Sequence, residues 1–241
     1  MRRLIRKFIK ALRLLPSGVY RKGLLHGVGA AIEHAAPLRQ LGMQTCVDVG
    51  ANVGQFTLLI RHEHPDAQVI AFEPLRGPAT TFADVFSSDQ AVTLHRTALG
   101  ETRATVNMHV SRRVDSSSLL PISDLQTRQF AGTEESGREA VTVAPMTDFV
   151  TAEMLVQPTL LKIDVQGVEL EVLKSAEPLL VYFKWIYVEA SFVQLYEGQA
   201  LAEDVIAHLQ QRGFALKGIY NPSNSVEGQA IQADFLFENS R

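Results

Sequence analysis

The chain has 241 residues, 46% of them hydrophobic, and a formal net charge of −3 at pH 7, which suits one soluble domain with a sizeable core. Its single cysteine, Cys46, excludes an internal disulfide and a multi-cysteine metal site and indicates a reducing compartment. No stretch reaches the roughly 18 apolar residues that a membrane-spanning helix needs.

The first 36 residues form a basic extension. Eight Lys or Arg residues precede the first acidic residue, Glu33, whereas the remainder has 15 basic and 26 acidic residues. In residues 1–15, apolar side chains recur at helical spacing, with the cations mostly on the opposite face. Neither a long apolar core nor a cleavage site is evident, which argues against a secretory signal. Two interpretations stay open: a helix on an anionic membrane surface, and a helix packed on its own domain.

Residues 37–241 alternate between strand and helix patterns. We expect strands at 45–49, 68–73, 92–98, 159–164, 185–189, 215–220 and 233–238, with helices at 55–62, 78–86, 167–175 and 201–212. This order predicts an α/β fold with a doubly wound, mostly parallel seven-stranded sheet. In such sheets the ligand crevice lies beyond the carboxyl ends of the strands, at the point where the strand order reverses.

An insertion at about residues 100–150 interrupts this alternation. Two short strand patterns, ATVNMHV and EAVTVAP, enclose a serine-rich polar segment. A long segment of this kind inside a domain is usually functional or disordered. We interpret it as a flap near the active site, the alternative being a mobile insertion without a catalytic part.

The turn after the first expected strand, in the stretch CVDVGANVGQF, is typical of a ligand-binding loop. Gly50, Asn52 and Gly54 form G-x-N-x-G, so the turn differs from the G-x-G-x-x-G that admits a pyrophosphate. Glu73 ends the second strand, 19 positions after Gly54, where a carboxylate can accept both hydroxyls of a ribose. Together these residues predict a nucleoside site.

Several motifs resemble a known family. DVGANVGQF followed by AFEP resembles the first two motifs of class I S-adenosylmethionine-dependent methyltransferases, and LLKIDVQGVELEVLKSAEPLL resembles the signature of the FkbM family among them. RTALGE, SSSLLP, MTDF, IYVEAS and ADFLFE resemble FkbM segments in the same order, over roughly residues 44–238. The chain departs from the pattern at Gln166, where the family often has glutamate, and at Met146 and Thr147.

The resemblance implies a Rossmann-like class I methyltransferase fold and a site for S-adenosylmethionine. Asp48 and the turn amides would hold the amino acid part of this cofactor, Glu73 its ribose, and the residues after the third strand its adenine edge. The implied cofactor-binding residues are Asp48, Gly50, Asn52, Gly54, Glu73, Thr97, Ala98 and Leu99.

Three carboxylates are the expected catalytic residues: Asp164, Glu169 and Glu189. Asp164 ends the fourth strand, where a negative charge can stabilise the cofactor's cation or orient an acceptor hydroxyl. Carboxylates that converge on one crevice raise each other's pKa values, so one of them could serve as general base. They could instead hold Mg²⁺ or Ca²⁺; we expect no required metal.

The resemblance implies methyl transfer from S-adenosylmethionine to a hydroxyl of a sugar or glycoconjugate. Two alternatives stay open: a nicotinamide-dependent oxidoreductase on a similar sheet, and a noncatalytic adaptor at a membrane surface. We expect a cytoplasmic enzyme without a nucleic-acid partner. Contact of residues 1–15 with the inner face of the membrane would suit a lipid-linked acceptor.

Overall fold

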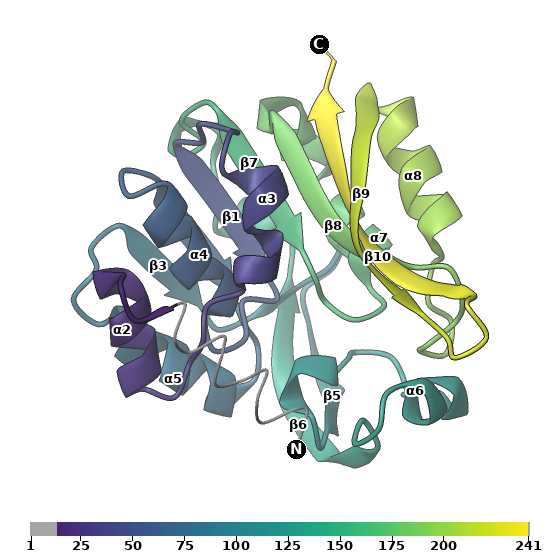
Figure 1. The fold of residues 1–241 in the computed structure, drawn as a ribbon. Coiled ribbons are helices and arrows are strands. Elements are labelled where there is room, and N and C mark those ends of the chain that lie inside the picture. The colour runs from purple at the N-terminus through teal and green to yellow at the C-terminus, as the bar shows by residue number, and fades with distance from the viewer. Residues whose placement is uncertain (1–13, 241) are drawn as a thin grey trace.

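A seven-stranded sheet runs through the computed structural model, which describes residues 14–240 (Figure 1). All strands are parallel except β10, which runs antiparallel to both of its neighbours. The order confirms the predicted doubly wound α/β sheet. In space the strands are β3 (Val92–His95), β2 (Gln68–Phe72), β1 (Thr45–Val49), β7 (Thr159–Ile163), β8 (Trp185–Ser191), β10 (Ala230–Asn239) and β9 (Phe214–Asn224).

The chain order reverses between β1 and β7. Strands β1, β2 and β3 extend the sheet in one direction and β7 and β8 in the other. The loops that follow β1 and β7 therefore leave the sheet side by side and diverge, which opens a crevice at their carboxyl ends.

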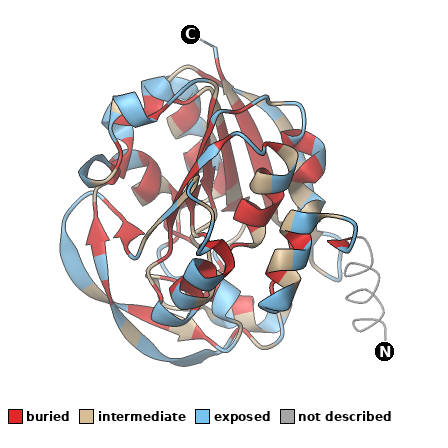
Figure 2. Ribbon diagram, turned by 90° about the vertical axis from the view of Figure 1, so that its left-hand side faces the viewer, coloured by how far each residue is buried: buried red, intermediate tan, exposed pale blue. Residues whose placement is uncertain are grey.

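Helices cover both faces of the sheet, and their outer sides are exposed in Figure 2. One face is covered by α2 (Gly18–Leu25), α3 (Ala35–Leu38), α4 (Gln55–Glu63) and α5 (Arg76–Phe86), and the other face by α7 (Glu169–Ser175) and α8 (Ala202–Gln211). Apolar side chains of the first four helices pack on Cys46, Val69 and Ala71 of the sheet. Those of α7 and α8 pack on Leu161, Ile186 and Phe235. Short 3-10 turns lie at η1 (Ile32–His34), η2 (Val114–Ser116), η3 (Met146–Asp148), η4 (Ala152–Met154) and η5 (Glu177–Tyr182).

The strand expected at residues 92–98 is split between two sheets. Strand β3 ends at His95, and Ala98–Leu99 form β4 in a separate sheet with β6 (Glu135–Ala144) and β5 (Ala104–Ser111). The hydroxyl of Thr97 donates to the carbonyl of Thr142 over 3.0 Å, at the point where the chain crosses from one sheet to the other. A partner 45 residues away decides this boundary, so local propensity did not reveal it.

The insertion packs against the loops that follow β7 and β8. Between β5 and β6 it holds η2 and α6 (Asp124–Gln129). Ser118 Oγ donates to the carbonyl of Gln166 over 2.6 Å, and the Tyr196 hydroxyl lies 3.0 Å from the carbonyl of Ser116. These bonds hold the serine-rich segment over the carboxyl ends of the central strands.

Residues 14–36 belong to the packed domain. Leu14 and Tyr20 are buried in one cluster with Leu58 of α4. The boundary expected at residue 37 therefore does not separate two packing units, because α2 needs α4 to cover its apolar side. Most of the expected basic helix, residues 1–13, lies outside the described residues. Within residues 14–240, no helix is long and apolar enough to cross a membrane.

If the basic extension lies on a membrane surface, the chain should bind anionic vesicles, and salt should weaken this binding. The first 13 residues hold six cations, each worth about 1 kcal/mol near an anionic surface. We expect the full chain to sediment with anionic vesicles at low salt and to be released at high salt, because screening shortens the reach of each charge. Replacing Arg2, Arg3 and Arg6 with glutamine should reduce the bound fraction.

A chain that begins at Leu14 is the matched control, because it keeps Leu14, Tyr20 and the other described residues that pack on α4. Neutral vesicles control for adsorption. Equal sedimentation of the full and the shortened chain with anionic vesicles would exclude the membrane interpretation.

Candidate functional site

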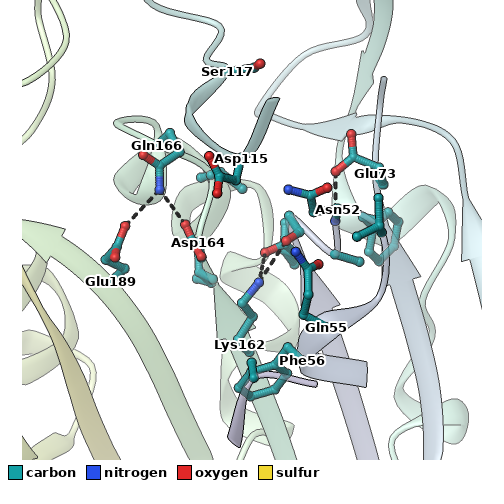
Figure 3. A pocket seen from close by; sticks show the side chains of 18 of the residues that line it. Asn52, Gln55, Phe56, Glu73, Asp115, Ser117, Lys162, Asp164, Gln166 and Glu189 are labelled. Atoms are coloured by element: carbon teal, nitrogen blue, oxygen red, sulfur yellow. Dashed lines mark hydrogen bonds between the residues drawn. The ribbon is translucent and has the colours of Figure 1, made fainter. Parts of the chain in front are cut away.

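One cavity of about 640 Å³ lies at the carboxyl ends of β1, β2, β7 and β8. Its volume is within the range of small-molecule sites. The strand ends and their loops form its floor, part of residues 14–34 forms one wall, and the insertion contributes another through Met108, Asp115 and Ser117. Figure 3 shows the polar side chains that these segments direct towards it.

The turn after β1 requires glycine at Gly50. Its φ is +77°, and a Cβ there would lie 1.8 Å from the carbonyl oxygen of Asp164. Asn52 also has a positive φ, +48°, which asparagine tolerates better than most residues. The turn thus brings its backbone, together with the Asn52 side chain, to the cavity wall.

Glu73 connects this turn to the end of β2. Its carboxylate accepts the backbone N–H of Asn52 over 2.9 Å and that of Leu75 over 2.8 Å. Burial raises the pKa of Glu73 to about 7, although these two N–H donors oppose the rise. The carboxylate lines the cavity, where the sequence predicts a ribose site.

A buried ion pair lies beneath the glycine turn. Lys162 Nζ is 3.0 Å from Asp48 Oδ1, and the Asp48 side chain is fully buried. The same ammonium donates to the carbonyls of Gly50 over 2.8 Å and Val49 over 3.3 Å. Thr57 Oγ1 donates to the other Asp48 oxygen over 2.7 Å. Lysine and aspartate together therefore hold the end of β1 and the start of α4 in one geometry.

Two neighbouring carboxylates decide the protonation of Lys162. Burial alone would lower its pKa, but Asp48 and Asp164 outweigh burial and raise the pKa above its usual value. Lys162 therefore stays an ammonium and a full hydrogen-bond donor. Asp48 is absent from the cavity lining, and its carboxylate lies beneath the turn, where it pairs with Lys162; its direct contact with the cofactor stays a prediction.

Thr97, Ala98 and Leu99 lie along the cavity where β4 begins. The Thr97 hydroxyl is directed to backbone carbonyls of Ala98 and Thr142. What this segment offers a ligand is therefore mainly apolar surface, which suits the flat face of a base.

Asp164 and Glu189 lie close together on the cavity floor (Figure 3). The Gln166 amide donates to Asp164 Oδ1 over 2.7 Å and to Glu189 Oε2 over 2.8 Å. Gln232 donates to the other Glu189 oxygen over 2.7 Å. Burial, together with Asp164, Asp234 and Glu169, raises the pKa of Glu189 well above its usual value. One amide thus holds two mutually repelling carboxyl groups in place.

Two other predicted site residues face away from the cavity. Glu169 accepts the N–H of Gly167 over 2.9 Å and is buried, with its pKa raised to about 7 by burial. It stabilises the loop before α7 and does not line the cavity. Gly54, with φ +96°, precedes α4, and a Cβ there would lie 2.5 Å from the Phe86 ring. Its role is close helix packing.

The sequence interpretation missed several residues that line the cavity: His34, Gln55, Asp115, Ser117, Lys162, Gln166, Tyr187 and Asp234. The sequence did contain a pattern that places Lys162. Leu160, Lys162 and Asp164 are two positions apart along one expected strand, so the first two side chains lie on the same face as the predicted site residue Asp164. His34 and Asp234 gave no comparable signal, since the tertiary fold alone joins them. Among residues 14–240, no group of three or more His, Cys, Asp or Glu side chains could hold a metal ion.

The sequence matches one methyltransferase family and two proteins that are named methyltransferases. The family described as Methyltransferase FkbM domain matches residues 48–216. Methyltransferase 1 of Beauveria bassiana (strain ARSEF 2860) is 26% identical over 183 residues, which cover 70% of this chain and 72% of that protein. Methyltransferase sdnD of Sordaria araneosa is 25% identical over 195 residues, with the same coverage.

The fold is similar to that of solved proteins with little sequence identity. Streptococcus pneumoniae Sp1610, solved in complex with S-adenosyl-L-methionine, matches with a TM-score of 0.50 and 11% identity over 87% of this chain and 72% of that chain. A Listeria monocytogenes serotype 4b protein, LMOf2365_1472, has a TM-score of 0.51 and 7% identity over 87% of this chain and 67% of that chain.

The buried pair beneath the turn predicts a large loss of stability in Lys162→Met. Removing one partner strands the Asp48 charge away from water, which typically costs about 3–5 kcal/mol. Urea unfolding of both proteins measures the difference. Lys174→Met is the matched control, because Lys174 lies 4.0 Å from Glu101 on the surface and should cost less than about 1 kcal/mol. Equal losses in the two variants would contradict the role given to the pair.

Proposed function

The chain belongs to the FkbM methyltransferase family, and from this premise we propose that it transfers a methyl group from S-adenosylmethionine to a hydroxyl of a sugar or glycoconjugate. S-adenosylmethionine, when bound, supplies an electrophilic methyl group on a positively charged sulfur. The family supports methyl transfer over the nicotinamide-dependent and adaptor alternatives. The acceptor class rests on the chemistry of the cavity.

The cavity residues fit this cofactor. Gly50 lines the cavity with backbone alone, so a ligand can approach the turn closely. Glu73 would accept the two ribose hydroxyls, and the segment Ala98–Leu99 would pack on the adenine. Asn52 would hydrogen-bond the polar end of the cofactor, together with the backbone of the turn.

The observation that carries the acceptor class is the carboxyl-rich lining of the cavity. Lys162 is its only Lys or Arg lining residue in the described chain, and that ammonium is engaged by Asp48 and backbone carbonyls. A phosphate or carboxylate on the acceptor would meet repulsion here, whereas hydroxyl groups can donate to the carboxylates. Six carboxyl side chains line the cavity: Glu33, Glu73, Asp115, Asp164, Glu189 and Asp234.

Asp164 and Glu189 would orient the acceptor. Methyl transfer is an in-line displacement that depends chiefly on positioning. A carboxylate beside the acceptor oxygen stabilises the positive charge that develops on that oxygen as the methyl group leaves sulfur. Glu169 would act only through the loop that carries Asp164.

Cofactor binding should depend on Glu73 and on pH. Glu73→Ala should weaken binding by about 1–3 kcal/mol, the usual value of a hydrogen bond to a charged group. Since burial raises the pKa of Glu73 to about 7, the carboxylate that ribose hydroxyls prefer forms as the pH rises. Wild-type affinity should therefore increase about tenfold from pH 6 to pH 8, as measured by calorimetry.

Glu73→Gln cannot ionise and should lose this pH dependence. Glu135→Gln, a control at a carboxylate outside the cavity, should retain it. A flat wild-type profile, or unchanged affinity in Glu73→Ala, would remove Glu73 from the cofactor site.

The acceptor class is tested with methyl-labelled S-adenosylmethionine and a panel of probes. We expect alkali-stable label, as in a methyl ether, on neutral methyl glycosides, and little label on glucuronate, sugar phosphates or RNA. Asp164→Asn should keep cofactor affinity and lose most of its turnover, because its contact matters most in the transition state. Alkali-labile label, or label on anionic probes alone, would contradict the proposal.

A further inference from the structure

A polar cluster at the β8–β10 side of the cavity has no catalytic role in the function proposed above. His34, in η1, lies beside Tyr187 of β8, Asp234 of β10 and Asn221 of β9. The first three of these residues line the cavity. They come from segments up to 200 residues apart, and the fold brings them to the same cavity as Glu73 and Asp164.

The imidazole of His34 is held firmly. Its ring packs edge-on against Tyr187, with centroids 5.7 Å apart, and against Phe56, at 5.8 Å. Nδ1 lies 3.1 Å from Asp234 Oδ2 and 3.0 Å from the Tyr187 hydroxyl. Nε2 has no hydrogen-bond partner among residues 14–240. One nitrogen is thus engaged in the cluster and the other is open.

The partners of Asp234 indicate which nitrogen carries the proton. Asp234 Oδ2 accepts from the Asn221 amide over 2.7 Å and from the Tyr187 hydroxyl over 3.0 Å. Burial and Asp234 raise the pKa of Tyr187, so its hydroxyl stays protonated and remains a donor to Asp234. The Asp234 carboxylate, 3.1 Å from Nδ1, is then the charged acceptor there, and the Tyr187 oxygen, 3.0 Å away, can only accept once its own proton is given to Asp234. A proton on Nδ1 donates to Asp234 and leaves a lone pair on Nε2.

The three carboxyl groups predicted from the sequence as catalytic already accept hydrogen bonds. Both oxygens of Glu189 accept side-chain amides, and both oxygens of Glu169 accept backbone N–H groups. Asp164 accepts the Gln166 amide, and an aspartate carboxylate is ordinarily a weaker base than imidazole. The groups that face His34 from neighbouring elements are a carboxylate, a phenol and an amide, none of which competes for Nε2.

We propose that His34 takes the proton from the acceptor hydroxyl through Nε2 and that Asp234 is the positioning residue that fixes its tautomer. The proposal rests on the proposed function. The acceptor oxygen forms a bond to the methyl carbon as the carbon–sulfur bond breaks. The electron pair of that bond stays on sulfur, and the hydroxyl proton passes to Nε2. Asp234 then stabilises the resulting imidazolium, as a carboxylate does when it orients a histidine base.

The tautomer is tested directly by nitrogen-15 NMR of the full chain labelled at histidine, at pH 8, with S-adenosylhomocysteine as the cavity probe. His34→Gln assigns the signal. We expect a proton on Nδ1 and none on Nε2, and loss of this preference in Asp234→Asn. The opposite tautomer, in which Nδ1 accepts from the Asn221 amide 3.2 Å away, would overturn the proposal.

The catalytic role is tested by initial rates with neutral methyl glycosides. Loss of a general base typically costs about 100-fold or more in turnover, so we expect such a loss in His34→Gln, with S-adenosylmethionine affinity unchanged within about twofold. Added imidazole should restore part of the rate of His34→Ala, which a purely structural histidine would not allow. His62→Gln is the matched control, because His62 bonds Ser17 outside the cavity.

These experiments separate a failure of the proposed function from a failure of the role proposed for His34. If wild-type protein labels none of the hydroxyl probes, the proposed function fails, and the proton-acceptor role fails with it. If wild-type protein and His34→Gln label them at equal rates, the function stands and the proposal for His34 is overturned.

Discussion

The ion pair of Lys162 and Asp48 is the interaction on which the rest of the site depends. It joins β1 to β7 at the point where the strand order reverses, and the same ammonium also holds the carbonyl of Gly50. Two charges in a dry interior are costly to bury, and the pair is stabilising only because both are satisfied by further hydrogen bonds. Because Lys162 also bonds the glycine turn, a change that breaks the ion pair would lower the stability of the domain and would also alter the cavity wall.

The same constraint makes the acidic cavity possible. Asp164, Glu189 and Asp234 occupy adjacent strand ends on the face above Lys162, and Glu189 is directly opposite Asp234 in the sheet register. Carboxylates this close repel one another. The structure reduces the repulsion with the Lys162 charge, with the Gln166 amide between two of them, and with a raised pKa at Glu189. These features suit hydroxyl-bearing ligands and a cationic cofactor.

Much of the fold and part of the site could be predicted from sequence. The strands around the sheet centre and the positions of Gly50 and Glu73 follow from apolar runs that end in polar turns. Position along the chain did not reveal the direction of two side chains. Asp48 and Glu169 lie close along the chain to residues that line the cavity. Both side chains nevertheless point away from it and accept hydrogen bonds from buried donors. Strand β4 also departs from expectation, because its partner is β6 and not β3.

The sequence by itself determined the element order, the sheet type, the glycine turn after β1 and the resemblance to the FkbM family, since each depends on local spacing along the chain. The tertiary structure alone decided which side chains share the cavity. It brings His34, from a segment expected to be a separate extension, to Asp234 near the other end of the chain. No periodicity encodes such a contact, because it arises only when an N-terminal turn packs across the carboxyl ends of strands that are far away in sequence.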